Sequence, residues 1–182
     1  MLHVRGDLLP YRGQDGAEVN PALYSSATGE WSTPQDFFDD VDSAFHFTVD
    51  AAASAENHKC PSYWDKALDG LHQDWRGVEG MIWCNPPYGR GIGEWLEKGP
   101  YTDSIFLVPA RTDTRWFKEA FEWAAELYLI AGRLKFGGAE NSAPFPSCMF
   151  RFTKKYAPST RVSYWRPTGA ADTALTRSME GA

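Results

Sequence analysis

The sequence predicts a single α/β domain with three layers, built around a largely parallel sheet that has antiparallel strands at its edge. Short apolar runs alternate with amphipathic helical segments between residues 31 and 131, a pattern typical of parallel strands joined by crossovers. Only strand-like segments follow residue 132, and these predict the antiparallel edge. A chain of 182 residues suits one well-buried core and is short for two domains.

Composition divides the chain into three parts. Residues 1–30 mix Gly, Pro, Ser, Asn and charge without an apolar period, so we expect an irregular N-terminal arm. Residues 31–166 carry the periodic segments and form the predicted domain. Residues 167–182 are small and polar, and we expect a flexible C-terminal tail.

The N-terminal half of the domain predicts one helix and two buried strands. Thr33 as N-cap and Pro34 at the first helical position predict a helix that ends near Phe45. Residues 47–50 and 81–84 are short apolar runs with strand character, and two prolines stop the second run.

The C-terminal half predicts two helices and five strands. A short helix follows Gly93 and a longer one covers residues 112–125. The predicted strands are the buried runs 104–109 and 127–131, followed by 133–136, 147–152 and 161–165.

The spacing of the cysteines and histidines argues against a disulfide framework and against a metal site. Cys60, Cys84 and Cys148 are odd in number, far apart and form no CxxC or Cys/His cluster, so we expect free thiols that are buried or half-buried, with no disulfide framework and no zinc site. No apolar run is long enough for a signal peptide or a membrane span, so we expect a soluble cytoplasmic protein without a membrane partner.

The net charge of −6 is unevenly distributed. Residues 1–99 hold 7 Lys and Arg against 16 Asp and Glu, whereas residues 100–182 hold 11 against 8. A phosphate-facing surface would therefore lie in the C-terminal half. The alternative, solvated charges on strand faces, remains equally open at this point.

Two unusual turns each follow a predicted strand directly. Asp50-Ala-Ala-Ala-Ser54 follows the first strand, and Asn85-Pro-Pro-Tyr88 follows the second. Ligands of open α/β sheets bind beyond the carboxyl ends of the strands, so we expect both turns to face one crevice.

The Asn85 turn has the chemistry needed to hold an amino group. The lone pair of an exocyclic amine is delocalised into its ring, and two acceptors placed at its N–H bonds can aim it at a methyl sulfonium. The Asn85 side-chain oxygen and the Pro86 carbonyl are such acceptors, and two prolines fix the turn in advance. Tyr88 offers a ring on which a base can stack. A purely structural turn with a packed tyrosine is the alternative.

An ordered set of motifs resembles the phage Dam-type DNA N6-adenine methyltransferase family. The resemblance covers about residues 31–153, with the Asn85 turn near its centre. The flanking motifs are Trp31-Ser-Thr-Pro34, Phe47-Thr-Val-Asp-Ala-Ala-Ala-Ser54, Asp69-Gly-Leu-His-Gln-Asp-Trp75, Leu107-Val-Pro-Ala-Arg111, Gly132-Arg-Leu-Lys-Phe136 and Pro144-Phe-Pro-Ser147.

This resemblance implies a Rossmann-like class I methyltransferase fold that transfers a methyl group from S-adenosylmethionine to adenine N6 in double-stranded DNA after base flipping. The implied catalytic residues are Asn85, Pro86, Pro87 and Tyr88. The implied cofactor-binding residues are Trp31, Thr33, Pro34, Asp50, Ala51, Ala52, Asp69 and Asn85. No metal is implied.

For the DNA side, the resemblance implies that Phe145 covers the flipped base opposite Tyr88. Arg111 follows a predicted strand, and Arg133 and Lys135 belong to the basic C-terminal half, so we expect these three to contact DNA. A solvated surface is the alternative for each.

Several alternatives stay open. The cofactor-binding turn lacks a G-x-G, and only 34 residues separate Asp50 from Asn85, so Glu56, Asn57 and Asp69 are all candidates for the ribose partner. The same turn also suits a protein glutamine-N5 methyltransferase, and a non-catalytic DNA-binding decoy is a third possibility. The recognition sequence and oligomeric state are not determined by the sequence.

Overall fold

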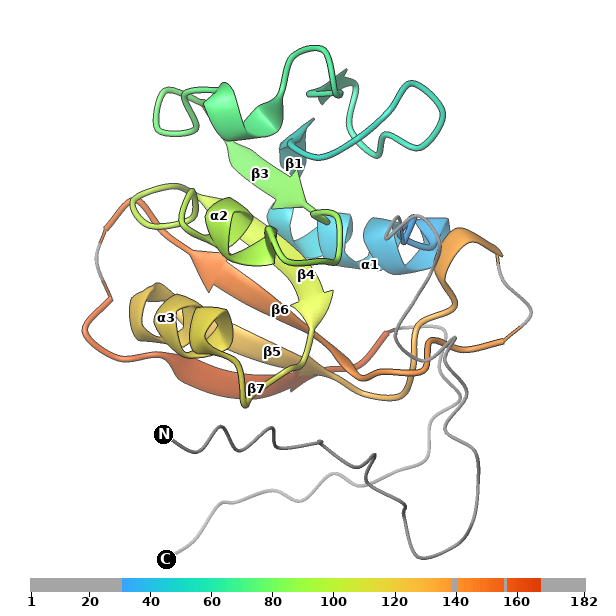
Figure 1. Ribbon diagram of the computed structural model, residues 1–182, viewed down its shortest axis with the longest axis vertical. Helices are drawn as coiled ribbons and strands as arrows, with labels where there is room; N and C mark the ends of the chain where they lie inside the picture. Colours follow the sequence, from blue (N-terminus) through green and yellow to red (C-terminus); the bar gives the residue numbers. More distant parts are fainter. Residues whose placement is uncertain (1–30, 139–140, 156, 168–182) are drawn as a thin grey trace, which may run out of the picture.

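The structure is a computed structural model that describes residues 31–138, 141–155 and 157–167. These residues form one seven-stranded sheet with helices on both faces (Figure 1). The predicted N-terminal arm and nearly all of the predicted C-terminal tail lie outside the described residues. The elements in chain order are α1 (Gln35–Phe45), β1 (Phe47–Asp50), β2 (Ser62–Tyr63), η2 (Gly70–His72), β3 (Met81–Cys84), α2 (Ile92–Leu96), β4 (Ser104–Pro109), α3 (Arg115–Trp123), β5 (Glu126–Ile130), η3 (Phe136–Gly138), β6 (Ser147–Phe152) and β7 (Arg161–Trp165).

The sheet has the strand order β2-β1-β3-β4-β6-β5-β7 and is mostly parallel. Only β6 among these strands runs antiparallel to its neighbours, and it lies inside the sheet between β4 and β5. The two edge strands, β2 and β7, are both parallel to their neighbours, so the predicted antiparallel edge is wrong. The run Ser147–Phe152 is buried almost continuously, which is the pattern of an interior strand covered on both faces.

The predicted strand at residues 133–136 is also wrong. This segment leaves β5 and enters the 3₁₀ turn η3, in which Gly137 has φ +61°. Leu134 and Phe136 are buried while Arg133 and Lys135 are exposed, so burial alternates as it would in a strand. The alternation arises because the segment packs one side on the core without pairing with the sheet.

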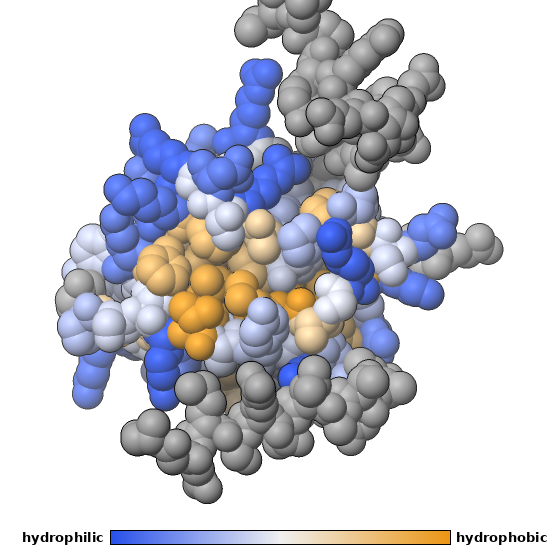
Figure 2. Space-filling view, turned by 90° about the horizontal axis from the view of Figure 1, so that it is seen from below, coloured by the Kyte–Doolittle hydropathy of each residue, from blue (hydrophilic) through white to orange (hydrophobic). Residues whose placement is uncertain are grey.

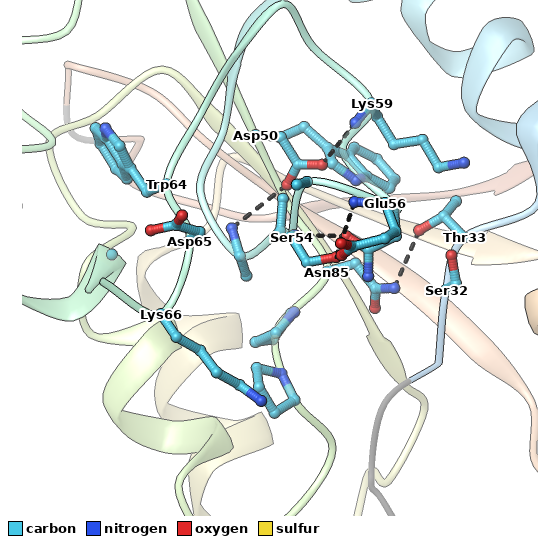
Figure 3. Close-up of a pocket in the computed structure, with 18 of the residues that line it drawn as sticks. Ser32, Thr33, Asp50, Ser54, Glu56, Lys59, Trp64, Asp65, Lys66 and Asn85 are labelled. Atoms are coloured by element: carbon cyan, nitrogen blue, oxygen red, sulfur yellow. Dashed lines mark hydrogen bonds between the residues drawn. The ribbon is translucent and has the colours of Figure 1, made fainter. Parts of the chain in front are cut away.

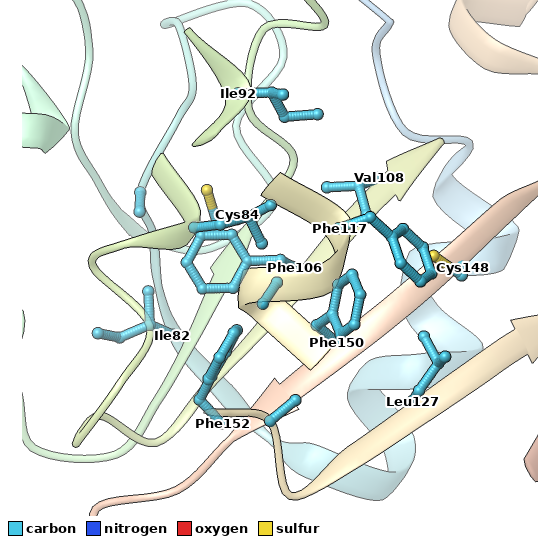
Figure 4. Close-up of a cluster of buried hydrophobic side chains, with 14 of the residues drawn as sticks. Ile82, Cys84, Ile92, Phe106, Val108, Phe117, Leu127, Cys148, Phe150 and Phe152 are labelled. Atoms are coloured by element: carbon cyan, nitrogen blue, oxygen red, sulfur yellow. The ribbon is translucent and has the colours of Figure 1, made fainter. Parts of the chain in front are cut away.

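Helices cover both faces of the sheet, as the three-layer prediction requires. On one face, Phe37, Phe38 and Val41 of α1 pack against Trp83 and Leu107. On the other face, α2 and α3 cover a core that contains Ile82, Phe106, Phe117 and Phe150 (Figure 4). Consecutive residues of β4 belong alternately to the two cores, and all six residues of that strand are buried.

The crossover from β1 to β3 contains no α-helix. It consists of the two-residue strand β2, the turn η2 and connecting loops, all of which are described (Figure 1). From β1 the chain passes to β2 at one edge of the sheet. It then returns to β3 on the opposite side of β1 and continues to β4 in that direction. The sheet therefore has its topological switch point at the carboxyl ends of β1 and β3, where open α/β sheets bind ligands.

Cys60, Cys84 and Cys148 are buried free thiols, as predicted. The face seen from below carries hydrophobic side chains ringed by hydrophilic ones (Figure 2). Among the described helices, none is long and apolar enough to cross a membrane.

Candidate active site

A cavity of about 760 Å³ opens at the switch point of the sheet (Figure 3). Its walls come from the turns after β1 and β3, from the segment before α1 and from the crossover that carries η2. This volume lies within the range of small-molecule and cofactor sites. The lining residues are Trp31, Ser32, Thr33, Asp50, Ala52–Asn57, Lys59, Trp64–Ala67, Asp69, Gly70, Trp83, Asn85, Pro86, Pro87 and Trp95.

Asp50 places a buried carboxylate in this cavity at the end of β1. Its Oδ2 accepts a hydrogen bond from the Lys59 backbone at 3.0 Å, and its Oδ1 accepts one from Ala52 at 3.4 Å. Burial raises the pKa of Asp50 to about 6, although both backbone donors and the nearby Lys59 ammonium act in the opposite direction. At neutral pH the group is therefore mostly ionised and suited to bind a cation.

Asn85 follows β3 and has its side-chain amide fixed by two acceptors. Its Nδ2 donates to the Trp31 carbonyl and, at 3.0 Å, to the Thr33 hydroxyl oxygen (Figure 3). Its Oδ1 is buried and has no hydrogen-bond partner within the described chain. A buried acceptor without a partner is costly, so this oxygen is suited to a ligand that supplies an N–H donor.

Thr33 does not cap α1 as predicted. The helix begins at Gln35 with Pro34 in the N-cap position and has no side-chain cap, and the first backbone bond runs from Phe38 to the Pro34 carbonyl. The Thr33 hydroxyl is instead used by Asn85, which is 52 residues away. A tertiary partner has replaced the local one.

The rest of the Asn85 turn divides between cavity and core. Pro86 and Pro87 line the cavity, and no hydrogen bond among the described residues uses the Pro86 carbonyl. Tyr88 is not a lining residue. Its hydroxyl donates to the Leu107 carbonyl at 3.3 Å, and burial raises the pKa of this phenol well above its ordinary value.

Tyr88 belongs to a group of four aromatic rings beside the cavity, with Trp31, Phe136 and Phe145. Its ring meets Phe145 edge-on, with centroids 5.7 Å apart, and Phe136 at 6.0 Å. Phe145 also meets Trp31 edge-on at 5.1 Å. A base stacked between two rings needs roughly 7 Å between them, so the Tyr88 and Phe145 rings do not form an open sandwich in this structure.

The opposite wall of the cavity is formed by Asp69 and Gly70 at η2 and by the tryptophans Trp64 and Trp95. Asp69 accepts from the Leu71 backbone at 3.1 Å and contacts His72 Nδ1 at 2.7 Å. A Cβ on the adjacent Gly70 would lie 2.2 Å from the Ala51 carbonyl oxygen and 2.9 Å from the Trp95 ring. Only a glycine allows this turn to approach β1 so closely.

The cavity brings together most of the predicted catalytic and cofactor residues. Three predicted residues, Pro34, Ala51 and Tyr88, lie next to it without lining it. All three candidate ribose partners line the cavity, so the structure does not choose among them. The predicted residues that line it are Trp31, Thr33, Asp50, Ala52, Asp69, Asn85, Pro86 and Pro87.

Sequence reasoning missed several lining residues. Trp64 and Trp95 had no motif to mark them, and Gly70 lay inside the Asp69–Trp75 motif without being assigned a role; the position of all three depends on how the crossover folds back over β1. Asp65 is a further acidic residue in the wall. The close pairing of Asp65 with Asp69 along the chain could have marked this region.

The predicted DNA-contacting residues lie at the same edge of the sheet as the cavity. Arg111 follows β4, and Arg133 and Lys135 follow β5, which is parallel to β4 because both are antiparallel to β6. All three are exposed, and no ion pair within the described residues involves them. Arg90, which the prediction omitted, is exposed just beyond the Asn85 turn.

Other basic residues of the C-terminal half have structural partners. Arg151 and Arg161 both bind Glu126, at 2.7 and 2.5 Å, and join β5 to β6 and β7. Arg115 and Lys118 pair with glutamates four residues later on α3. These four cations therefore have acidic partners within the described residues, unlike Arg111, Arg133 and Lys135.

Comparison with known proteins confirms the resemblance seen in the motifs. The family described as "DNA N-6-adenine-methyltransferase (Dam)" matches residues 22–164. A DNA N-6-adenine-methyltransferase of Escherichia phage T1 is 33% identical over 109 residues, which cover 57% of this chain and 45% of the phage protein. The match thus spans under half of that relative's length. Because the family match covers most of the chain, this protein belongs to the DNA N-6-adenine-methyltransferase (Dam) family.

Proposed function

We propose that this protein transfers a methyl group from S-adenosylmethionine to adenine N6 in double-stranded DNA, using a Rossmann-like class I methyltransferase fold. The observation that carries the proposal is the Oδ1 of Asn85, which has no partner in the described part of the chain and is a fixed acceptor at the edge of a cofactor-sized cavity. Adenine N6 supplies the N–H donor that this oxygen lacks. Family membership supports DNA as the substrate.

The cavity residues fit the proposed cofactor chemically. Asp50 is a buried carboxylate that suits the cationic amino group of the methionine part. Trp64 and Trp95 offer apolar ring surface, and Asp69 offers an acceptor, for the adenosine part. Trp31 and Thr33, which the resemblance assigns to the cofactor, both hydrogen-bond to Asn85. The reactive end of the cofactor would therefore lie near the acceptor that holds the target amine.

The protein residues hold and orient the target amine. Asn85 Oδ1 and the Pro86 carbonyl accept from its two N–H bonds, and the prolines keep both acceptors aimed before substrate arrives. When bound, S-adenosylmethionine supplies a methyl carbon that gains a bond to N6 as its bond to sulfur breaks, after which N6 releases a proton to water. No protein group with a shifted pKa is required as a base.

A flipped base would contact the aromatic group beside the cavity. Tyr88 is held by its bond to Leu107, whereas Phe145 lies in the connection between β5 and β6. We therefore assign Tyr88 as the fixed stacking surface and Phe145 as the ring that moves aside to cover the base. Base stacking on an aromatic ring contributes about 1–3 kcal/mol, which offsets part of the lost stacking in the duplex.

The DNA backbone would lie along the carboxyl edge of the sheet. Arg111, Arg133 and Lys135 are exposed cations at that edge, and they suit contacts to phosphates on either side of the flipped nucleotide. A glutamine side chain in a protein substrate would present the same kind of N–H donor to Asn85. The basic edge and the family membership favour DNA over this alternative and over a decoy that lacks chemistry.

Asn85→Ala tests the proposal. This variant should lose methyl transfer to DNA by about a thousandfold or more, because it removes an acceptor that orients the reacting nitrogen. Its affinity for S-adenosylmethionine, measured by calorimetry, should stay within a few-fold of wild type. Retained transfer of labelled methyl groups to plasmid DNA would show that the assigned role is wrong.

A further inference from the structure

We infer that Thr33 is a positioning residue for the proposed reaction, acting through the side-chain amide of Asn85. The inference rests on the proposed function and goes beyond it, because the motifs assign Thr33 only to the cofactor site. Its basis is the hydrogen-bond network that joins Thr33, Trp31 and Asn85.

The network fixes which end of the Asn85 amide faces Trp31 and Thr33. The Trp31 carbonyl can only accept hydrogen bonds, so the amide atom that faces it must be the nitrogen. The second hydrogen of that nitrogen points to Thr33 Oγ1 at 3.0 Å. Both donors are then used, and Oδ1 is the end of the amide that remains for a ligand.

The reversed amide would lose the bond to the Trp31 carbonyl, whereas the Thr33 hydroxyl could donate to Oδ1 in place of accepting from Nδ2. Turning the Asn85 side chain by half a revolution would place Oδ1 against the Trp31 carbonyl, so that two acceptors would face each other. Its Nδ2 would then point toward the target amine, which is itself a donor. The Trp31 carbonyl therefore selects the amide orientation that can accept from an N–H group, and the Thr33 hydroxyl pairs the second Nδ2 hydrogen and holds the amide in that orientation.

Thr33 can perform this task because its own position is fixed. The residue is only 5% exposed, and it directly precedes Pro34, the N-cap of α1, whose carbonyl accepts the first backbone bond of the helix. The neighbouring Ser32 carbonyl accepts from the Gly137 backbone at 2.8 Å, and the Trp31 ring packs on Phe136 and Phe145. The segment that orients Asn85 is thus held by the same loop that carries Arg133 and Lys135.

This role is distinct from binding the cofactor. A residue that only binds the cofactor lowers the rate at limiting cofactor concentration, and saturation restores the rate. A residue that positions Asn85 lowers the rate of the chemical step even when both substrates are saturating. The two roles therefore differ in what saturation does.

The decisive variant is Thr33→Val, with Thr33→Ser as the matched control. Valine keeps the buried shape and removes the acceptor, whereas serine keeps the hydroxyl. We expect the single-turnover rate of methyl transfer, with S-adenosylmethionine and adenine-containing duplex both saturating, to fall ten- to hundredfold in Thr33→Val. Thr33→Ser should stay within about threefold of wild type.

Cofactor binding and folding are measured on the same samples. The calorimetric affinity of Thr33→Val for S-adenosylmethionine should stay within a few-fold of wild type, and the binding stoichiometry gives the folded fraction by which each rate is corrected. If Thr33→Val gives too little folded protein, Thr33→Ala replaces it with the same expected loss.

The outcomes separate this inference from the proposed function. A saturated Thr33→Val rate equal to wild type, or a defect that saturating cofactor removes, would overturn the positioning role. If Asn85→Ala is inactive in that same assay, the proposed function stands without it. Activity retained by Asn85→Ala would instead overturn the assignment of Asn85, and this inference would fall with it.

Discussion

At the level of single residues, the site depends on polar side chains that are buried with unusual surroundings. Asp50 is 3% exposed and carries a carboxylate whose two oxygens accept from backbone N–H groups. Asn85 keeps one buried oxygen that has no hydrogen-bond partner among the residues that the structure describes. The burial of the Asp50 charge and the unsatisfied Asn85 oxygen each cost stability in the free protein, and a ligand can offset both costs, which is typical of a binding site.

The raised pKa of Asp50 predicts a pH-dependent stability difference. The folded-state pKa is about 6 and the ordinary value is 3.8, so between these values the folded protein holds a proton that the unfolded chain has released. The contribution of this group to stability therefore falls as pH rises from about 4 to about 6, and is constant above that window.

Asp50→Asn removes this titration. The free energy of unfolding of Asp50→Asn minus that of wild type should become more positive by about 1.4 kcal/mol between pH 5 and pH 7.5, as chemical denaturation would measure. Other titrating groups cancel in this difference. A difference that does not change with pH would contradict the burial of an ionisable group at this position. The same variant should bind S-adenosylmethionine more weakly at pH 7.5.

At the level of elements, the cavity exists because the β1 to β3 crossover folds back without an α-helix. The turn η2 approaches β1 closely at Gly70, and the buried Trp75 indole donates to the Gly70 carbonyl at 2.7 Å. The Lys98 ammonium, just after α2, donates to two carbonyls of the same region, at Leu71 and Gln73. This wall is therefore held to the sheet and to α2 by specific bonds.

Gly70→Ala should move this wall. The new Cβ would collide with the Ala51 carbonyl, which belongs to the backbone directly after β1 and cannot yield easily. We expect a loss of about 1–3 kcal/mol in the free energy of unfolding, and a calorimetric affinity for S-adenosylmethionine that falls about tenfold or more. Gly89→Ala is the control for stability, because a Cβ there meets nothing within 4 Å. Equal stability of both variants would show that η2 is free to move.

At the level of the whole molecule, the charge distribution matters more than the total of −6. The exposed cations Arg111, Arg133 and Lys135 lie at the sheet edge that holds the cavity, whereas Arg151 and Arg161 are bound to Glu126. An acidic protein can bind a polyanion when the cations that lack acidic partners gather on one edge.

This arrangement predicts a salt dependence of DNA binding. Replacing Arg111, Arg133 or Lys135 by Gln should weaken binding and reduce the slope of log affinity against log salt by about one for each phosphate that the variant no longer neutralises. Fluorescence anisotropy with a labelled duplex at several salt concentrations measures this slope. Lys118→Gln is the matched control, since Lys118 pairs with Glu122 on α3 and should leave the slope unchanged. Equal slopes for all variants would place the DNA elsewhere.

The sequence by itself determined the layers, most strands and the two turns at the cavity. Local signals suffice there, because apolar runs identify the buried strands. A polar residue that ends a strand, as Asp50 does, or directly follows one, as Asn85 does, lies at the carboxyl edge. The number and spacing of the cysteines also predicted free thiols, and the structure shows that all three are buried. The family resemblance, carried by ordered motifs, was confirmed by the family match.

Only the tertiary structure decided which residues become partners. The position of β6 inside the sheet, the unpaired path of residues 133–136 and the Thr33 bond to Asn85 each depend on contacts between distant segments. Gly70 and Trp95 joined the cavity for the same reason. Local propensity acts over a few residues, whereas strand order and the orientation of a buried amide are set by whichever long-range contacts satisfy all groups at once.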